Sequence, residues 1–385
     1  MIEDFDMNPR SIAFLFASLT ASAIAGDQYW VFFGTYTSGK SPSKGIYRAK
    51  FNSGTGELGK PELAAELGSP SFLAIAPSKQ FLYAVGEAGG QGNKGVSAFK
   101  LGLPGGELTP LNAVSAVGEG PCHVNTDRTG QMVGIANYGS GSVASYKVGA
   151  DGSLSEAVSF IQHEGSSVNP KRQAGPHAHS INFSPDNRFA YVCDLGMDQI
   201  QIYKVDPAKG ALTPNEPAFA KTPVGGGPRH LAFHPNGQFV FVNNEMSLAE
   251  TVFAYDAQSG ALTAVETVST LPAGEVASGG LSTAETVVHP NGKFVYVSNR
   301  GHDTIAVFSF DSEKGKLTLI QNASAEGEVP RNFNIDPTGK WMIVAHQKSN
   351  SVALLKVDEV TGKLSFTGTK HEVGAPVCVR FVALD

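Results

Sequence analysis

A recurring segment constrains the fold of this chain more than any other feature. Seven copies of the triplet Gly-x-Leu lie at steps of 50, 46, 58, 50, 55 and 47 residues, with the leucine at Leu58, Leu108, Leu154, Leu212, Leu262, Leu317 and Leu364. A second segment accompanies it, in which an apolar run, a Pro/Gly turn and a Tyr- or Phe-Val strand follow one another, as in GPRHLAFHPNGQFVFVNNE at 227–245. Repeats of this length indicate a fold built from copies of one supersecondary unit.

Each repeat is predicted to form four short strands. In the clearest copy these are residues 231–233, 239–243, 251–255 and 262–265, with Pro-Asn-Gly between the first two. Asn-Gly between apolar runs favours a tight hairpin, and no helical periodicity intervenes. We therefore expect an all-β fold, a seven-bladed β-propeller of four-stranded blades. An open solenoid is the alternative, but it would need capping repeats.

The two ends of the chain each carry part of one repeat. The C-terminal GAPVCVRFVAL, residues 374–384, contains only a first strand, whereas the segment from residue 27 starts at a second strand. We predict that the N- and C-terminal strands pair in one blade and close the ring, which removes exposed sheet edges. Residues 26–385 would then be a single propeller domain.

Residues 1–25 are interpreted as an export signal. Arg10 precedes a small, apolar stretch that ends in Ala23-Ile24-Ala25, the pattern of a secretory cleavage site. The acidic start suits such a signal poorly, so Met7 is an alternative initiator. We expect a periplasmic or secreted protein, and a cytoplasmic protein with a buried N-terminal strand or helix is the alternative.

Charge and cysteine content limit the partners. With 29 Lys and Arg against 35 Asp and Glu, the net charge is −6, so neither nucleic acid nor an anionic membrane is an expected partner. The three cysteines lack CxxC spacing, which argues against a zinc site and leaves at most one disulfide, with the pairing of Cys122 and Cys193 open. We expect no cofactor and no metal.

Two glycine-rich segments match phosphate-binding patterns without the helix that those patterns need. Residues 34–41 spell G-x-x-x-x-G-K-S, but Pro42, Gly45 and a predicted strand at 46–51 follow. Residues 90–95 spell G-x-G-x-x-G and lead into a predicted strand. Both are interpreted as loops between strands.

The predicted topology indicates where functional side chains gather. Because the first and second strands of a blade are antiparallel, the start of one and the end of the other lie at the same mouth of the central channel. Polar residues occupy these positions: His123, His179, Arg229, His230, Glu285 and Arg331 at first-strand starts, and Tyr36, Glu87, Asn137, Tyr138, Asp194, Asn244, Glu245, Asn299, Arg300, His346 and Gln347 at second-strand ends. Their arginines predict an anion-binding pocket.

Other chemistries have weaker support. The chain contains no G-x-S-x-G nucleophile elbow. Cys122 and His123 are adjacent, but neighbouring strand residues point to opposite faces, so a small buried cysteine is favoured over a thiol nucleophile. A metal held by Glu87, Asp194 and Glu285 is a further alternative, without a ligand motif behind it.

Four stretches carry a family resemblance: SINFSPDNRFAYV (180–192), GPRHLAFHPNGQFVFVNNE (227–245), FVYVSNRGHDTIAVF (294–308) and PRNFNIDPTGKWMIVAHQKS (330–349). They resemble the seven-bladed propeller lactonases, which unite the propeller-type 6-phosphogluconolactonase and the carboxy-cis,cis-muconate cyclase. The resemblance spans essentially all of the chain after residue 25. It implies a lactonase that acts on a small-molecule sugar lactone, with the active-site group His179, Arg229, Glu245 and Arg300.

The roles expected from this resemblance are those of metal-independent hydrolysis. Arg229 and Arg300 would hold an anionic group and stabilise the oxyanion. Glu245 would act as general base on water and His179 would protonate the leaving ring oxygen, or the two would exchange roles. Further residues expected to bind substrate are His177, His230, Glu285, Arg331, Gln347 and Asn137. The motif His177-Ala178-His179 leaves open which histidine acts.

Three alternatives remain at this point. Export would separate the protein from a cytosolic phosphorylated lactone, so an unphosphorylated sugar lactone is an alternative substrate. A cycloisomerase that forms a lactone from a muconate-like diacid would use the same charges. A non-catalytic propeller that binds a ligand or a partner through its faces would need none of them.

Overall fold

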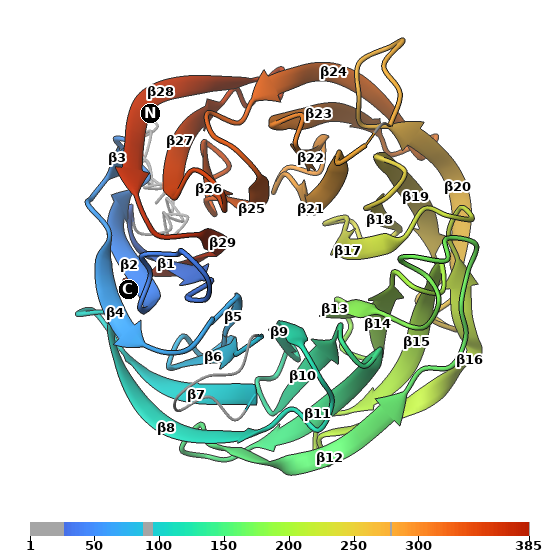
Figure 1. Ribbon diagram of the computed structural model, residues 1–385, viewed down its shortest axis with the longest axis horizontal. Coiled ribbons are helices and arrows are strands. Elements are labelled where there is room, and N and C mark those ends of the chain that lie inside the picture. The colour runs from blue at the N-terminus through green and yellow to red at the C-terminus, as the bar shows by residue number, and fades with distance from the viewer. Residues whose placement is uncertain (1–26, 88–94, 278, 385) are drawn as a thin grey trace, which may run out of the picture.

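The seven repeats form a ring of seven antiparallel sheets around a central axis (Figure 1). The computed structural model describes residues 27–87, 95–277 and 279–384. Within these ranges every element is a strand, and none is a helix long and apolar enough to span a membrane. The predicted all-β, seven-bladed β-propeller is confirmed.

Six blades each consist of four strands that follow one another in the chain, from the axis outwards. The first two of them are β5 (Phe72–Ile75), β6 (Phe81–Val85), β7 (Gly95–Gly102) and β8 (Glu107–Ser115), and β9 (Pro121–Thr126), β10 (Met132–Asn137), β11 (Ser142–Val148) and β12 (Leu154–Gln162). The next two are β13 (Ala178–Phe183), β14 (Phe189–Asp194), β15 (Gln199–Asp206) and β16 (Ala211–Lys221), and β17 (Pro228–Phe233), β18 (Phe239–Asn244), β19 (Ala249–Tyr255) and β20 (Leu262–Ser269). The last two are β21 (Ser282–Val288), β22 (Phe294–Arg300), β23 (Thr304–Asp311) and β24 (Lys316–Ser324), and β25 (Pro330–Ile335), β26 (Trp341–His346), β27 (Ser351–Val357) and β28 (Leu364–Glu372).

The seventh blade joins the two ends of the chain. Its inner strand β29 (Pro376–Ala383) pairs antiparallel with β1 (Gln28–Thr35), with Phe33 opposite Val379. β1 then pairs with β2 (Gly45–Asn52), and the outer strand is split into β3 (Glu57–Leu58) and β4 (Glu62–Glu66). Pro61 lies at this break, where it has no N–H to donate to a ladder. The predicted closure by the terminal strands is therefore confirmed, as Figure 1 shows.

The Gly-x-Leu signature is explained by packing between blades. Gly260 has a φ of +76°, which favours glycine, and a Cβ placed on it would lie 2.8 Å from a ring carbon of Phe189 in the preceding blade. The Tyr191 hydroxyl donates to the Gly260 carbonyl at 2.7 Å. Leu262 belongs to the same interblade core. The triplet therefore marks the place where one blade fits against the next.

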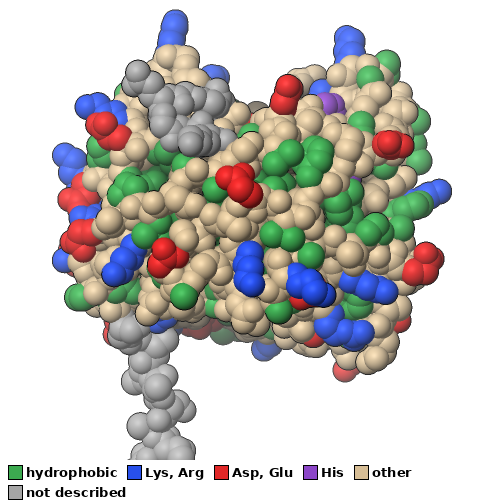
Figure 2. Space-filling model, turned by 90° about the horizontal axis from the view of Figure 1, so that it is seen from below, with side chains coloured by type: hydrophobic (Ala, Val, Ile, Leu, Met, Phe, Trp, Pro, Cys, Tyr) green, Lys and Arg blue, Asp and Glu red, His purple; other side chains and the backbone are tan. Residues whose placement is uncertain are grey.

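The apolar core lies between neighbouring blades, because both faces of each inner sheet are covered. One cluster joins Tyr191 and Ile202 of one blade to Val240 and Val242 of the next. Figure 2 shows the ring from the side, with charged groups of both signs spread over the outer wall and a hollow in the upper face. This packing fixes the inner strands, whose ends build the site.

The glycine-rich segment at 34–41 runs from the end of β1 into the loop before β2, so it is a connection between strands. The export signal predicted at 1–25 lies outside the described residues, as does most of the segment at 90–95.

Candidate functional site at the channel mouth

β-Bulges at the start of the inner strands direct side chains toward the channel mouth. In β13 the pairing with β14 skips His179, because Ala178 lies opposite Asp194 and Ser180 opposite Cys193. The same interruption falls on Arg229 in β17 and on Arg331 in β25. A bulge adds one residue to a strand and re-aims its side chain. The fold thus presents equivalent positions of several blades to one opening.

The ends of the second strands contribute through a pair of residues. The first member is buried and holds the hairpin together, as Asn244 does by donating from Nδ2 to the Thr251 hydroxyl at 2.9 Å. The second member, which follows the last pairing, lines the mouth, as Glu245 does. In the same way, Asn299 donates to the Thr304 hydroxyl of its own hairpin at 3.3 Å, and Arg300 lines the mouth.

A cavity of about 300 Å³ occupies the mouth. We call it the mouth pocket, and it is lined by Glu87, Cys122, Tyr138, Arg172, His179, Glu245, Arg300 and Arg331. These residues come from six blades and from the loop between β12 and β13, which carries Arg172. Six of the residues predicted at the mouth are therefore brought together around one space: Glu87, Tyr138, His179, Glu245, Arg300 and Arg331.

Glu245 is the centre of the charge network in this pocket. Its Oε1 lies 2.8 Å from Arg172 Nη2, and its Oε2 lies 3.0 Å from Arg229 Nε and 3.1 Å from Arg300 Nη2. Burial alone would raise the pKa of Glu245, but the charges of Arg300 and Arg229, with Arg172, lower it to about 2. Glu245 is thus a permanent carboxylate at neutral pH, with both oxygens engaged.

The arginines outnumber the carboxylates at the mouth. Arg229 is 2% exposed and lies below the pocket, whereas Arg172, Arg300 and Arg331 line it. With Glu245 and Glu87 as counterions, the group carries a formal excess of two positive charges in a chain of net charge −6. Arg300 Nε is buried and has no hydrogen-bond partner within the described part of the chain. The mouth therefore has the excess of arginine on which the prediction of an anion-binding pocket depends.

Arg331 is the arginine least committed to protein partners. Its guanidinium lies 5.4 Å from the centre of the Tyr36 ring, and the Tyr36 hydroxyl donates to Glu87 Oε2 at 2.7 Å. Among the described residues, no carboxylate or carbonyl accepts a hydrogen bond from it. Its donors therefore remain for a ligand.

His179 is a neutral imidazole on the pocket wall. Burial, with the positive charge of Arg229, holds its pKa well below the usual range. Its Nδ1 lies 3.8 Å from Cys122 Sγ, and its Nε2 makes no hydrogen bond with any described residue. Burial raises the pKa of the Cys122 thiol, so this cysteine is a neutral side chain rather than a thiolate.

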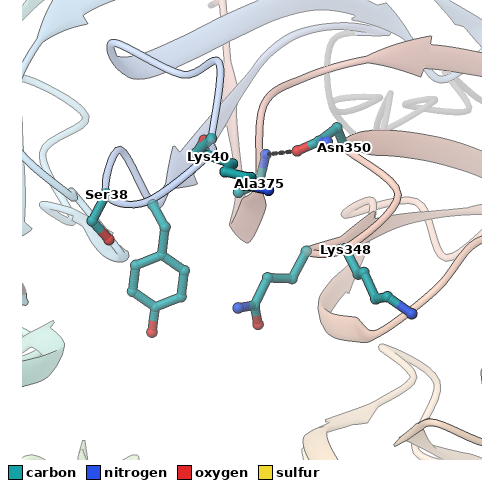
Figure 3. A pocket seen from close by; sticks show the side chains of 8 residues that line it. Ser38, Lys40, Lys348, Asn350 and Ala375 are labelled. Atoms are coloured by element: carbon teal, nitrogen blue, oxygen red, sulfur yellow. Dashed lines mark hydrogen bonds between the residues drawn. The ribbon is translucent and has the colours of Figure 1, made fainter.

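Five of the six residues predicted to bind substrate lie outside the mouth pocket. His177 stacks on Tyr138 and contacts the Tyr138 carbonyl through Nδ1 at 2.9 Å. Asn137 is fully buried and donates to Ala116 and Ser142. A separate cavity of about 380 Å³, shown in Figure 3, is lined by Gln347 together with Tyr36, Ser38, Lys40, Ser41, Lys348, Asn350 and Ala375. His230 and Glu285 line a third cavity, deeper in the channel.

The acidic residues considered for a metal have separate protein partners. Glu87 accepts from Tyr36, Asp194 Oδ2 lies 2.6 Å from His163 Nδ1, and Glu285 Oε1 lies 2.8 Å from His230 Nδ1. In the described ranges, no three His, Cys, Asp or Glu side chains are arranged to hold a metal ion.

One charged lining residue, Arg172, escaped the sequence analysis. Arg172 lies in a loop between blades, where no strand periodicity predicts its position. Strand topology predicted both Asn137 and Tyr138 at the mouth, and only Asn137 was assigned to substrate binding, but the side chain that lines the pocket is that of Tyr138, the residue after the strand end. The repeated division of tasks in such pairs is the signal that would have chosen Tyr138 over Asn137.

The sequence of this chain matches a known protein family. The family described as lactonase, 7-bladed β-propeller, matches residues 30–381. The 6-phosphogluconolactonase of Bacillus subtilis is 38% identical over 309 residues, which cover 80% of this chain and 85% of that protein. The 6-phosphogluconolactonase of Formosa agariphila is 34% identical over 312 residues, covering 80% and 86% of the two chains.

Solved structures agree in fold over nearly the whole chain. The periplasmic gluconolactonase of Pseudomonas aeruginosa superposes with a TM-score of 0.87 at 34% identity. The match covers 93% of this chain and all of that one.

Proposed function

This chain belongs to the seven-bladed β-propeller lactonases, and on that basis we propose that it hydrolyses the ring ester of an aldonolactone that carries an anionic group. The observation that carries the proposal is the mouth pocket itself, in which three lining arginines converge with a neutral histidine and one clamped carboxylate. Its volume of about 300 Å³ suits a single sugar. The 6-phosphogluconolactonases among its relatives support an acidic sugar lactone.

Arg300 and Arg172 would stabilise the developing oxyanion on the lactone carbonyl. Both reach Glu245 with one nitrogen and have further N–H groups at the pocket. Preorganised cationic donors in a site shielded from water lower the energy of such a transition state most effectively. Arg331, which has no protein acceptor among the described residues, would bind the anionic group of the substrate.

The environment of Glu245 argues against a role for it as either general base or general acid. A carboxylate held by three arginines, with a pKa of about 2, is a weak base for water. We assign to Glu245 the role of holding the arginines in place. His179, neutral and with a free Nε2, would accept the proton of the attacking water.

The step balances through His179. A new bond forms between the water oxygen and the lactone carbonyl carbon, and the proton released by water moves to His179 Nε2. The bond between that carbon and the ring oxygen then breaks, and the same proton passes to the ring oxygen as it leaves. The product is the open hydroxy acid, and His179 returns to its neutral form.

Export is part of the proposal. The small, apolar stretch before Ala25 and the likeness to a periplasmic gluconolactonase support it. An N-terminus mapped by mass spectrometry on protein from cell fractions tests it, since cleavage after Ala25 is expected and an intact N-terminus in the cytosol contradicts it.

The catalytic proposal is tested on purified protein with δ-gluconolactone and its 6-phosphate, after subtraction of spontaneous ring opening. His179→Gln is expected to lower kcat by about 10²–10⁴-fold, whereas His177→Gln keeps most of the activity because its ring lies outside the pocket. Arg331→Gln should raise the KM of the phosphorylated lactone more than that of the neutral one. Equal rates for His179→Gln and the parent would refute the assignment.

A further inference from the structure

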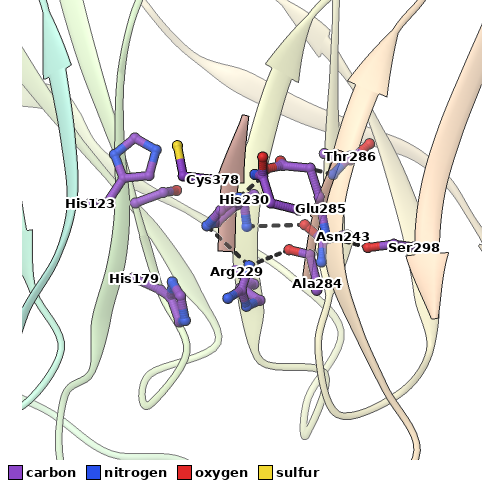
Figure 4. A network of polar contacts seen from close by, with 12 residues as sticks. His123, His179, Arg229, His230, Asn243, Ala284, Glu285, Thr286, Ser298 and Cys378 are labelled. Carbon is purple, nitrogen blue, oxygen red and sulfur yellow. Dashed lines mark hydrogen bonds and ion pairs between the residues drawn. The ribbon is translucent and has the colours of Figure 1, made fainter. Parts of the chain in front are cut away.

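His230 and Glu285 form a polar layer directly below the mouth pocket. They line a cavity of about 140 Å³ with His123, Asn125, Arg380 and others, and neither borders the mouth pocket itself. Both are buried, at 4% and 7% exposure. Figure 4 shows His230 between Arg229 on one side and Glu285 on the other. This layer is therefore connected to the site through Arg229.

The direction of each hydrogen bond in this layer follows from chemistry. An arginine only donates, so His230 Nε2 accepts from Arg229 Nη1 at 3.1 Å. Burial and the charge of Arg229 hold the pKa of His230 well below the usual range, so the ring is neutral and its single proton is on Nδ1. That proton is donated to Glu285 Oε1 at 2.8 Å. Glu285 thus selects the tautomer that Arg229 needs.

Arg229 is held at two of its three nitrogens. Its Nε donates to Glu245 Oε2 at 3.0 Å, and its Nη1 donates to His230 and to the Ala284 carbonyl. A guanidinium is planar, so two fixed nitrogens determine the direction of the third. Within the described residues Nη2 makes no hydrogen bond, which leaves it for a ligand.

We propose that Glu285 and His230 are positioning residues, which act through Arg229 to fix the guanidinium plane beneath the lactone. The proposal rests on the hydrolytic function proposed above. The sequence alone predicts that these two residues bind the substrate directly. The proposal gives them an indirect role instead.

The hydrogen bonds around Glu285 fit its carboxylate form only. Oε1 accepts from His230 Nδ1 and from the Thr286 amide at 3.0 Å, and Oε2 accepts from Asn332 Nδ2. Asn332 cannot turn its amide without losing another bond, because its Oδ1 accepts from the Val379 amide at 2.8 Å. A proton on either oxygen of Glu285 would therefore point at a hydrogen-bond donor. It would break the chain of hydrogen bonds that runs from Glu285 through His230 to Arg229, which we call the relay.

The charges around Glu285 place this protonation near neutral pH. Burial raises the pKa of Glu285 to about 7, against the opposing charges of Arg380 on β29 and Arg229 on β17. The other titratable groups that face this layer include His123 on β9 and His179 on β13, whose pKa burial lowers, and Glu250 on β19 and Cys378 on β29, whose pKa burial raises. All four are neutral at pH 7. The charge of Arg331 on β25 also lowers the pKa of His230. The kcat of the wild-type enzyme should therefore fall as the pH drops through about 7.

Glu285→Gln tests the relay. Whichever way the glutamine amide turns, its NH₂ group faces another donor, either Asn332 Nδ2 or His230 Nδ1–H. In the second case His230 loses its acceptor at Nδ1, and the tautomer whose Nε2 accepts from Arg229 is no longer favoured. The expected result is a kcat lower by about 10–100-fold and a nearly unchanged KM. The fall in kcat that the wild type shows as the pH drops through about 7 should be absent. Replacing a residue with a purely structural role would leave this pH dependence of kcat unchanged.

Glu250→Gln is the matched control. Glu250 is fully buried and accepts from the Thr286 hydroxyl at 2.7 Å, but it forms no hydrogen bond or ion pair with His230 or Arg229. Because burial already keeps it neutral, the amide should leave kcat, KM and the pH profile as in the wild type.

The possible outcomes separate this inference from the proposed function. A wild-type protein that opens no lactone faster than buffer contradicts the proposed function. An active wild-type enzyme for which Glu285→Gln behaves like Glu250→Gln overturns the relay alone. If Glu285→Gln does not fold, the wild-type profile still decides, since a kcat that is flat between pH 6 and 8.5 also overturns it.

Discussion

Arg172 Nη2 lies 2.8 Å from Glu245 Oε1, although Arg172 belongs to a loop and the two residues are 73 positions apart. The same nitrogen donates to the Tyr138 hydroxyl at 3.0 Å. This loop therefore completes a pocket whose other walls are strand ends, and it brings a third arginine to the carboxylate.

Arg172→Gln should lower kcat/KM for the lactone on the order of 10²-fold, because one cationic donor is removed from the oxyanion site. The fold should persist, since the Arg172 side chain is 42% exposed. Steady-state kinetics together with thermal melting measure both effects. Lys171→Gln removes the same charge one residue away and should retain the parental rate, and a similar loss in both variants would point to a general charge effect.

The ion pairs of Glu245 should be visible in acid stability. Its folded pKa of about 2 is below the usual value of 4.5, so its stabilising contribution is present above pH 4.5 and is lost as the pH falls toward 2. The difference in melting temperature between the wild type and Glu245→Gln should be constant above pH 5 and shrink between pH 4.5 and 2. A difference that stays constant down to pH 2 contradicts the assigned ion pairs.

Gly260→Ala tests the interblade packing of the repeated triplet. At a φ of +76° and with a Cβ 2.8 Å from Phe189, alanine should destabilise the fold by about 2–4 kcal/mol. Gly237 has a similar φ of +69° but open space around it, so Gly237→Ala should cost only about 1 kcal/mol. Urea unfolding measures both, and equal losses would show that backbone strain alone sets the cost.

The three cysteines should be unreactive in the native protein. Cys122, Cys193 and Cys378 are all free and buried, so the open question of a disulfide between Cys122 and Cys193 is answered in the negative. Burial raises the pKa of each thiol, which removes the reactive thiolate. A thiol reagent should titrate no group under native conditions and three in denaturant. Fewer than three in denaturant would indicate a disulfide.

The fold was predictable because each repeat contains a recognisable turn at the same position. The glycine at the Gly-x-Leu turn, as at Gly260, marks both a backbone conformation and a contact between blades, so seven copies indicate seven blades. The incomplete repeats at the two ends predicted the pairing of β1 with β29. Family membership, and with it the expected enzyme of the lactone-hydrolysing class, is confirmed by the match over residues 30–381, which argues against a non-catalytic scaffold.

The site was predictable to the level of a strand end, but not to the level of depth in the channel. Arg229 and His230 are neighbours in sequence, yet the bulge at Arg229 leaves one beside the mouth and the other in the layer below. Hydrophobic alternation does not reveal a bulge. Arg172 could not be predicted for a different reason. It lies in a loop, and a loop has no periodic pattern from which the position of a side chain can be inferred.

The strand that closes the ring, β29, has a consequence for when the buried network of the channel is complete. Asn332, which donates to Glu285, is itself held by the Val379 amide of β29. A chain that has completed its other blades but has not yet docked β29 therefore lacks the anchor of its buried network. Maturation of activity should coincide with the final docking event rather than grow blade by blade.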